Sequence, residues 1–303
     1  MLNVHYMLSR EIEIPVPWGF IAAKVWGDKA NCIVLLVHGI FDNLESFDAL
    51  VPLLPESYFY VAIDLPGHGR SSHYSKSVAN HLLDQVIAIR LVIRYLKENP
   101  IILIGHSFGG KISAMYSQLY PNEVSRLIII EGSYLNFRQV EKFKDHYKNY
   151  INQVCHTLTK ISTKRAPTFT YENGFSAFIS KRLHGGMAEE AAERLYKRNI
   201  VSVGAGRYQS KIDPLLRHSS CMAINASWSQ DIFVKLPILC PTMYIVGKKS
   251  TIPNETREHL LKLIKLNSRG VIKIVEGGHH VLSDSPETIA PLICHFLRNK
   301  CNL

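Results

Sequence analysis

The sequence predicts an α/β fold in which a mostly parallel central sheet is flanked by helices. Four short apolar runs support this prediction: Cys32–His38, Tyr58–Asp64, Ile101–Gly105 and Arg126–Glu131. Because the runs are continuous rather than alternating, they are typical of strands that are covered on both faces. Between the second and third runs, Asn80–Lys97 has apolar residues at helical spacing. Such alternation of strand, helix and strand indicates an α/β sheet.

Further elements extend this sheet. Thr242–Val246 and Val271–Glu276 are two more strand candidates, and Pro286–Arg298 is an amphipathic helix candidate with a proline at its start. Near the N-terminus, Glu11–Trp26 contains two short strand candidates separated by a turn rich in proline and glycine. We expect these two strands to form a meander at one sheet edge and the last helix to close against the sheet.

A long insertion separates the fourth strand from the fifth. It contains about 110 residues without a comparable strand, which is too many for a loop in a compact domain. Helical patterns occur instead around Phe137–Leu158, Gly174–Leu183 and Ala188–Arg198. We therefore predict a helical cap at residues 134–235, inserted into a core domain of residues 1–133 and 236–303.

The positive charge of the chain is concentrated in the predicted cap. The net charge is +10, and Tyr134–Lys235 contains 16 Lys and Arg against 8 Asp and Glu. A basic surface attracts anionic esters, acyl-CoA thioesters or an acidic membrane, although a solvated charged face is the simpler interpretation. No nucleic-acid-binding motif accompanies the charge, so we expect no nucleic-acid partner.

The remaining composition, with 47% hydrophobic and 20% charged residues, is that of an ordinary globular protein. The six cysteines form no C-x-x-C pair, which indicates neither a metal site nor a compact disulfide framework, and we expect reduced thiols. No signal peptide or transmembrane segment is indicated, so we expect a cytoplasmic protein. The last tripeptide, Cys-Asn-Leu, only faintly resembles a peroxisomal address.

The segment with the clearest chemistry is Ile101–Gly110, which contains a G-x-S-x-G motif centred on Ser107. The motif lies between an apolar strand and a plausible helix, which is the context that a nucleophile elbow requires. A serine at such a sharp turn has strained backbone angles that expose its hydroxyl, and side chains at Gly105 and Gly109 would collide. The alternatives are a tight turn that merely uses glycine and a dinucleotide-binding turn, but a G-x-G-x-x-G is absent.

Two more glycine-containing segments end earlier strands, His38–Asn43 (HGIFDN) and Asp64–Ser72 (DLPGHGRSS). With GHSFGG, in this order and spacing, they resemble the α/β-hydrolase family over essentially the whole chain. Asp42-Asn43 and Lys211–Leu215 resemble the serine hydrolase-like, or kraken-like, group of that family. The resemblance implies an α/β-hydrolase fold: a mostly parallel sheet flanked by helices, with a helical cap inserted after the strand that follows the nucleophile helix.

The oxyanion hole of this fold takes one backbone N–H from the residue after the nucleophile, here Phe108. The other N–H comes from the loop after an early strand, most simply from Ile40. Preorganised donors of this kind contribute about 3 kcal/mol each to transition-state stabilisation. His38 lies at the end of that strand, and we expect it to hold the loop by hydrogen bonds rather than to take part in catalysis.

The general base is expected on the loop after the last strand, where Gly277-Gly278 precedes His279 and His280. The family pattern places the catalytic histidine directly after glycine and about seven residues before the proline of the final helix. His279 fits this pattern with respect to Pro286, and His280 is one place late.

The acid departs from the usual family pattern, in which a G-x-x-D follows the strand before the last one. That stretch here is Gly247–Ser250, with serine at the expected place of the carboxylate. Glu131, at the end of the strand after the nucleophile helix, is the candidate acid because related hydrolases use that location. It could instead cap neighbouring amides, and a weakened dyad or a loss of catalysis stays open. We interpret Asp284 as a helix cap before Pro286.

The sequence therefore predicts a serine hydrolase without metal or cofactor, in which Ser107 attacks an acyl carbon, His279 accepts its proton and Glu131 orients the imidazole. A carboxylic ester of a small molecule with an apolar acyl or alcohol group is the expected substrate, because some of the cap aromatics must face the elbow. Thioester, amide or C–C hydrolysis at the same site and a non-catalytic binding protein are the alternatives. A serine nucleophile argues against epoxide hydrolysis and dehalogenation.

Overall fold

The computed structural model describes residues 7–74, 81–97, 100–132, 143–218, 231–232 and 234–298. Within them, one sheet has eight strands in the order β1-β2-β4-β3-β5-β6-β9-β10. β1 and β2 are antiparallel to their neighbours, and all other pairs are parallel. The strands are β1 (Ser9–Val16), β2 (Gly19–Trp26), β3 (Ile33–Val37), β4 (Phe59–Ile63), β5 (Ile101–His106), β6 (Val124–Ile130), β9 (Thr242–Gly247) and β10 (Gly270–Val275).

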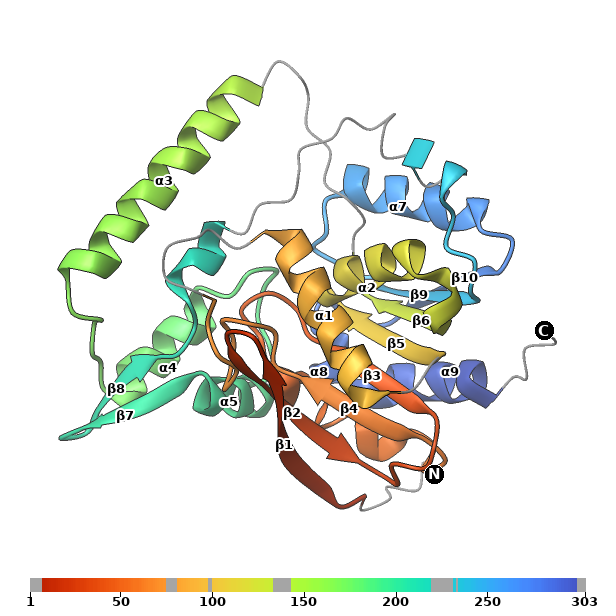
Figure 1. The fold of residues 1–303 in the computed structure, drawn as a ribbon, viewed down its shortest axis with the longest axis horizontal. Coiled ribbons are helices and arrows are strands. Elements are labelled where there is room, and N and C mark those ends of the chain that lie inside the picture. Colours follow the sequence, from red (N-terminus) through yellow and green to blue (C-terminus); the bar gives the residue numbers. More distant parts are fainter. Residues whose placement is uncertain are drawn as a thin grey trace.

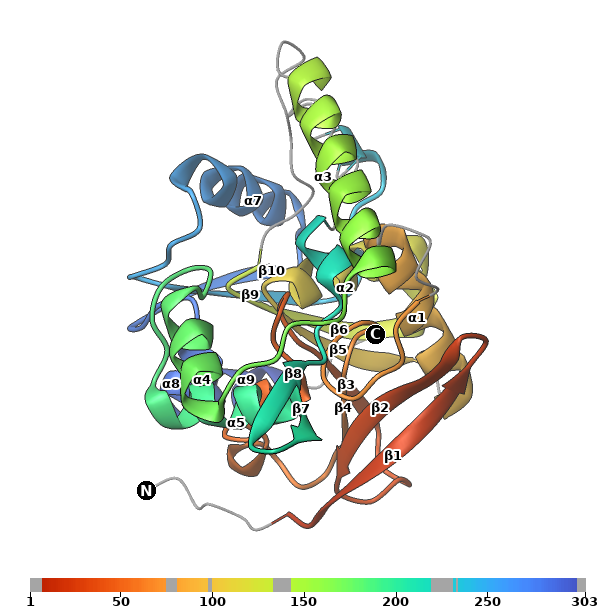
Figure 2. The same cartoon turned by 90° about the vertical axis from the view of Figure 1, so that its left-hand side faces the viewer.

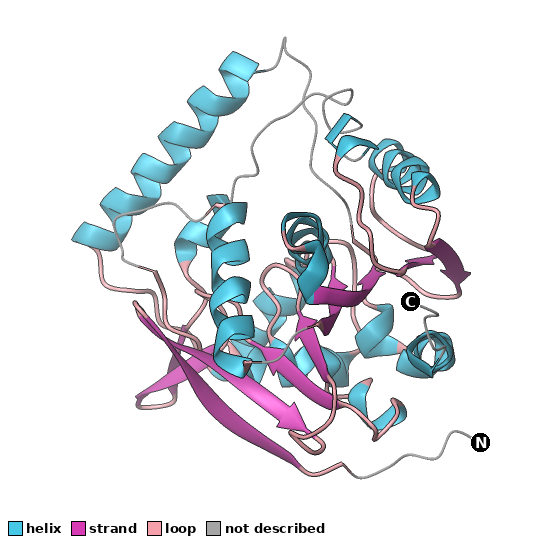
Figure 3. Cartoon of the chain, turned by 45° about the vertical axis from the view of Figure 1, so that its right-hand side comes forward, coloured by secondary structure: helices cyan, strands magenta, loops and turns pink. Residues whose placement is uncertain are grey.

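Helices cover both faces of this sheet (Figures 1 and 3). One face packs against α1 (Leu82–Leu96), α2 (Phe108–Leu119) and α7 (Asn254–Leu266). The other packs against α8 (Val281–Asp284), α9 (Pro286–Arg298) and the short 3-10 helices η1 (Leu44–Phe47) and η2 (Val51–Leu53). A further 3-10 helix, η3 (Pro121–Glu123), precedes β6.

The continuous apolar runs have the predicted cause. Every residue of β3 is buried, and successive residues face opposite cores: Leu35 lies in the cluster with α1 and α2, and Leu36 lies in the cluster with α9. A strand that is buried on both faces cannot carry polar residues at alternate positions. The mostly parallel sheet, the N-terminal meander at its edge and the closing helix at Pro286–Arg298 are confirmed.

The described part of the insertion between β6 and β9 contains helices and one hairpin. The predicted helical patterns correspond to α3, α4 and α5, except that residues 137–142 lie outside the described residues. α3 projects away from the sheet (Figures 1 and 2). The hairpin was not predicted, and the division into core and cap domains stays our proposal. The elements are α3 (Phe143–Thr163), α4 (Tyr171–Ser180), α5 (Glu189–Arg198), β7 (Ile200–Gly204), β8 (Arg207–Ser210) and η5 (Pro214–His218).

A buried arginine joins this insertion to the sheet. Arg198, at the end of α5, is 3% exposed, and its Nε donates to Asp64 Oδ2 at 2.8 Å. Its Nη1 and Nη2 donate to the carboxylate of Glu11 on β1 at 2.9 and 3.3 Å. Buried charges are tolerated when they are paired and hydrogen-bonded in this way. The network therefore fixes α5 against the carboxyl end of β4.

Arg198→Leu should lower the free energy of unfolding by about 3–5 kcal/mol, because the fully buried Asp64 carboxylate would lose its charged partner. Urea denaturation of the purified variant measures the change. The matched control is Arg194→Gln, which removes an arginine of the same helix whose partner Glu190 is exposed, and we expect it to change stability by less than about 1 kcal/mol. Equal effects of the two substitutions would contradict the structural role of Arg198.

Candidate active site

Ser107 lies at the turn between β5 and α2, and its backbone is strained. Its φ and ψ angles are 52° and −113°, a conformation that L-residues rarely adopt. A Cβ atom on Gly105 would lie 2.5 Å from Gly109 O, and one on Gly109 would lie 2.1 Å from Val37 O. Both glycines are therefore needed at this turn, as the sequence predicted.

The structure brings the three predicted catalytic residues together. His279 Nε2 lies 3.0 Å from Ser107 Oγ, and His279 Nδ1 lies 3.2 Å from Glu131 Oε2. Glu131 is fully buried and His279 is 4% exposed. In the neutral imidazole tautomer that suits both contacts, Nδ1–H donates to Glu131 and Nε2 accepts from the serine hydroxyl. The arrangement can thus transfer the serine proton to the imidazole while a carboxylate holds the ring.

The parallel sheet explains why these side chains meet. Ser107 follows β5, Glu131 follows β6, and His279 follows β10, so each lies after the carboxyl end of a strand. β5 pairs with β6, and β6 and β10 both pair with β9. The strand order also reverses at β3, which lies beside β5. Sites in open α/β sheets typically lie outside the carboxyl ends of strands at such a reversal.

Two donors other than His279 hold the Glu131 carboxylate. The Gly247 amide donates to Oε1 at 2.6 Å, and Ser250 Oγ donates to Oε2 at 2.7 Å. Burial raises the pKa of Glu131, and the hydrogen bonds from Ser250 and Gly247 oppose that effect. Ser250 thus occupies the place where the family usually carries its acid and donates to the glutamate instead. The sequence shows a serine at this position but contains no signal for its contact with Glu131.

The loop after β3 lies directly against the elbow. A Cβ atom on Gly39 would lie 3.2 Å from Ser107 Cβ. Within the described residues, neither the Ile40 amide nor the Phe108 amide donates a hydrogen bond to a turn, a loop or a side chain. Phe108 is also the first residue of α2, where the helix dipole favours negative charge. Both predicted oxyanion donors are therefore without a hydrogen-bond partner in the part of the chain that the structure describes.

His38 supports this loop as expected. Its Nε2 accepts from the Leu65 amide at 2.9 Å, and its Nδ1 lies 2.7 Å from Gly39 O. These two contacts use both ring nitrogens, which leaves none for proton transfer.

A histidine of the insertion stacks on His279. The rings of His184 and His279 are 4.2 Å apart between centroids and inclined by 34°. Burial, followed by the charges of His184 and His280, lowers the pKa of His279 to about 3. No motif marks His184 in the sequence, and its left-handed backbone, with φ of 68°, would have been expected only of a glycine or asparagine.

The predicted role of Asp284 is wrong. Its Oδ1 accepts from the amide of Ala188, the residue before α5, at 2.9 Å. The carboxylate therefore binds the insertion, and no hydrogen bond of the described residues joins it to the start of α9. His280, next to the predicted base, is 4% exposed, and neither of its ring nitrogens has a partner among the described residues.

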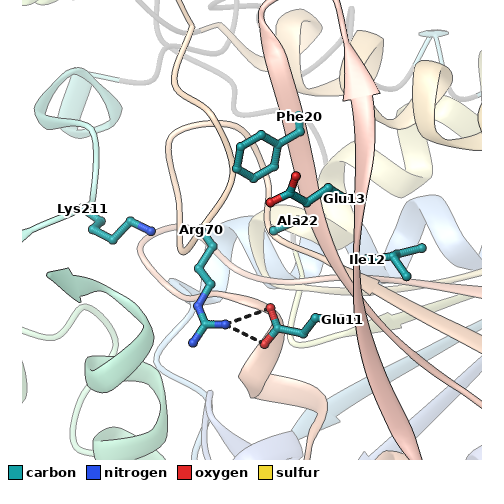
Figure 4. A pocket seen from close by; sticks show the side chains of 7 residues that line it. All are labelled: Glu11, Ile12, Glu13, Phe20, Ala22, Arg70 and Lys211. Atoms are coloured by element: carbon teal, nitrogen blue, oxygen red, sulfur yellow. Dashed lines mark hydrogen bonds and ion pairs between the residues drawn. The ribbon is translucent and has the colours of Figure 1, made fainter.

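A separate pocket lies on the β1–β2 side of the sheet (Figure 4). It includes none of the three catalytic candidates and combines opposite charges from the sheet, from Arg70 and from Lys211. Arg70 donates to both oxygens of Glu11 at 2.9 and 3.0 Å, and Glu11 also binds Arg198. We therefore interpret this pocket as the surface of the network that anchors α5.

The described residues show no metal site or disulfide. No group of three or more His, Cys, Asp and Glu residues in that part of the chain is arranged to hold a metal ion. Cys32, Cys155, Cys240 and Cys294 form no disulfide with one another. No helix of the same described part is long and apolar enough to cross a membrane.

The chain belongs to the α/β-hydrolase fold family, whose model matches residues 33–286. It is 30% identical to serine hydrolase-like protein 2 of Homo sapiens, with 96% of this chain and 95% of the relative covered. It is 36% identical to a putative esterase/lipase of Haemophilus influenzae, with 88% and 83% covered. A solved hypothetical protein of Pseudomonas aeruginosa has a TM-score of 0.81 at 25% identity, with 95% and 97% covered. These similarities confirm the predicted family and fold.

Buried histidines should make the protein sensitive to acid. Burial lowers the pKa of His38, and it lowers that of His68, His106 and His279 to about 3 and of His280 to about 4. Below about pH 6.5 the unfolded chain binds protons that the folded chain does not, so stability falls as the pH falls.

Between about pH 7.5 and pH 5, the free energy of unfolding of His280→Leu should fall by about 2 kcal/mol less than that of the wild type. The reason is that the substitution removes one histidine whose pKa is lowered in the folded state. Urea denaturation of the wild type and the variant at both pH values measures the difference. Parallel pH dependences of the two proteins would contradict a neutral, buried His280.

Proposed function

We propose that the protein is a serine hydrolase that cleaves a carboxylic ester of a small molecule through an acyl-enzyme. The observation that carries the proposal is the position of His279, which contacts Ser107 Oγ with one ring nitrogen and Glu131 with the other. Membership of the α/β-hydrolase family and the similarity to a putative esterase/lipase support the same reaction class.

Acylation begins with attack of Ser107 Oγ on the acyl carbon while its proton passes to His279 Nε2. The imidazolium then forms beside the Glu131 carboxylate, which stabilises the positive charge and fixes the ring. The negative charge on the substrate oxygen is received by the Ile40 and Phe108 amides. Collapse of the tetrahedral intermediate expels the alcohol, which takes the proton from His279.

Deacylation repeats these steps with water as the nucleophile. His279, neutral again, accepts a proton from water as the water attacks the ester carbonyl of acylated Ser107. The second tetrahedral intermediate releases the acid, and the serine recovers its proton. Because burial holds the pKa of His279 below its ordinary value, the base stays neutral at and below neutral pH.

The substrate is an ester with an apolar acyl or alcohol group. Insertion aromatics supply apolar surface, but several of them pack with one another. Tyr196 lies with its ring centroid 5.1 Å from Tyr171, 5.3 Å from Phe175 and 5.6 Å from Phe178. This aromatic cluster therefore packs within the insertion, and we expect the remaining insertion aromatics to supply apolar surface near the elbow.

Glu131, which follows a different strand from the usual family acid, allows a direct test of the proposed triad. Glu131→Gln should lower kcat for a p-nitrophenyl ester by about 10³-fold or more, because a neutral amide cannot stabilise the imidazolium. Adding Ser250→Asp to this variant should restore part of the lost activity. In the wild type Ser250 Oγ lies 2.7 Å from Glu131 Oε2, so the new aspartate carboxylate would lie close to the place of the lost glutamate carboxylate.

Steady-state kinetics of the wild type, the single variant and the double variant measure this, with Ser107→Ala as the inactive reference. Ser250→Asp alone is the matched control for damage at that position. Near-normal activity of Glu131→Gln would remove Glu131 from the mechanism, and hydrolysis by Ser107→Ala would contradict the nucleophile.

A further inference from the structure

The loop that carries Ile40 is bound by a buried arginine of the insertion. Arg182 Nη2 donates to Asp42 Oδ1 at 2.6 Å, and the two side chains are 7% and 4% exposed. Arg182 follows α4 and is 140 residues from Asp42 in the chain. A charge-assisted contact of this kind between buried groups strongly restricts the geometry of both partners.

The residues on both sides of Asp42 are bound by the same segment. Asn199 Nδ2 donates to Phe41 O at 3.2 Å. Asn43 Nδ2 donates to Leu195 O at 2.8 Å and lies 3.1 Å from Asn199 Oδ1. Three consecutive loop residues are thus held by residues 182–199, which belong to the insertion and not to the sheet.

This loop needs external support because its own backbone is strained. Phe41 has φ of 65°, in the left-handed region that an aromatic residue rarely adopts. Within the described residues, the backbone hydrogen bond that closes this turn is a 3.2 Å contact from the Asp42 amide to Gly39 O. Gly39 lies against both the nucleophile and this aspartate, since a Cβ atom there would be 3.2 Å from Ser107 Cβ and 3.4 Å from Asp42 Oδ2.

We propose that Arg182 is a positioning residue of the active site: by holding Asp42, it fixes the Gly39–Asn43 loop so that the Ile40 amide faces the oxyanion. The inference rests on the proposed hydrolase function. It assigns the insertion a part in transition-state stabilisation in addition to any part in substrate choice. Arg182 touches no reacting atom and acts only through the loop.

A direct electrostatic role of Arg182 gives a different signature. Its charge lowers the pKa of His279, whereas the charge of Asp42 raises it. Loss of the arginine through that effect would move the acid limb of the pH profile and leave the plateau rate unchanged. Loss of loop positioning lowers the plateau itself, because one oxyanion donor is misplaced at every pH.

The test compares Arg182→Met and Arg182→Lys with the wild type on p-nitrophenyl butyrate, with kcat and KM measured on the pH plateau. An alkyl boronic acid, which forms a tetrahedral adduct with serine, serves as the transition-state analogue. We expect Arg182→Met to lower kcat by about 10²-fold, with KM within about threefold of the wild type. The affinity for the boronic acid should fall by a factor similar to that of kcat, and Arg182→Lys should recover part of both.

The matched control is Lys181→Gln, which removes an equal charge from the exposed neighbouring residue. It should leave kcat and the affinity for the boronic acid unchanged. If Arg182→Met does not fold, Asp42→Asn in the same chain removes the unpaired carboxylate, and the double variant should show the same loss of kcat. An unchanged kcat, or a rise in KM alone, would overturn the positioning role. An inactive wild type would count against the proposed function and not against the loop contact.

Discussion

The buried carboxylate of Glu131 is the group on which the geometry of the site depends. It is fully buried at the end of β6 and receives hydrogen bonds from Gly247, from Ser250 and from His279. A buried carboxylate is stable only when such donors surround it. Because Gly247 ends β9, Ser250 follows it and His279 follows β10, one side chain links three strand ends and orients the imidazole toward Ser107.

The sheet alone does not complete the site. Core residues near the carboxyl ends of the strands are bound by the inserted segment: Asp42 by Arg182, Asp64 by Arg198 and Asp284 by the Ala188 amide. His184 of the same segment stacks on His279. Two of these contacts, Asp42 with Arg182 and Asp64 with Arg198, join buried charges, which cost free energy unless both partners are in place. The insertion and the catalytic loops are therefore expected to keep their relative positions as one unit.

The features of the fold and of the site that could be predicted depend on residues close to one another in the sequence. The elbow at Ser107 and the turn at Gly277, two residues before His279, are set by steric rules that act over a few residues, since Gly277 has φ of 125°. Continuous apolar runs in the sequence predict buried strands. The contacts of Ser250 and Arg182 could not be predicted, because they join residues 119 and 140 positions apart. The hairpin β7–β8 was missed because its strands are mostly exposed and carry no apolar run. The two glycines of Gly204-Ala205-Gly206 are a turn signal in the sequence, and all three residues have positive φ in the structure.

The proposed mechanism requires Ser107 to be an activated nucleophile. The most direct measurement is the intact mass of the folded protein after treatment with a small fluorophosphonate, followed by peptide mapping, with Ser107→Ala and His279→Ala in parallel. We expect one adduct on Ser107, absent in Ser107→Ala and formed far more slowly in His279→Ala. No adduct on folded wild type, or labelling that does not depend on His279, would contradict the activation of Ser107.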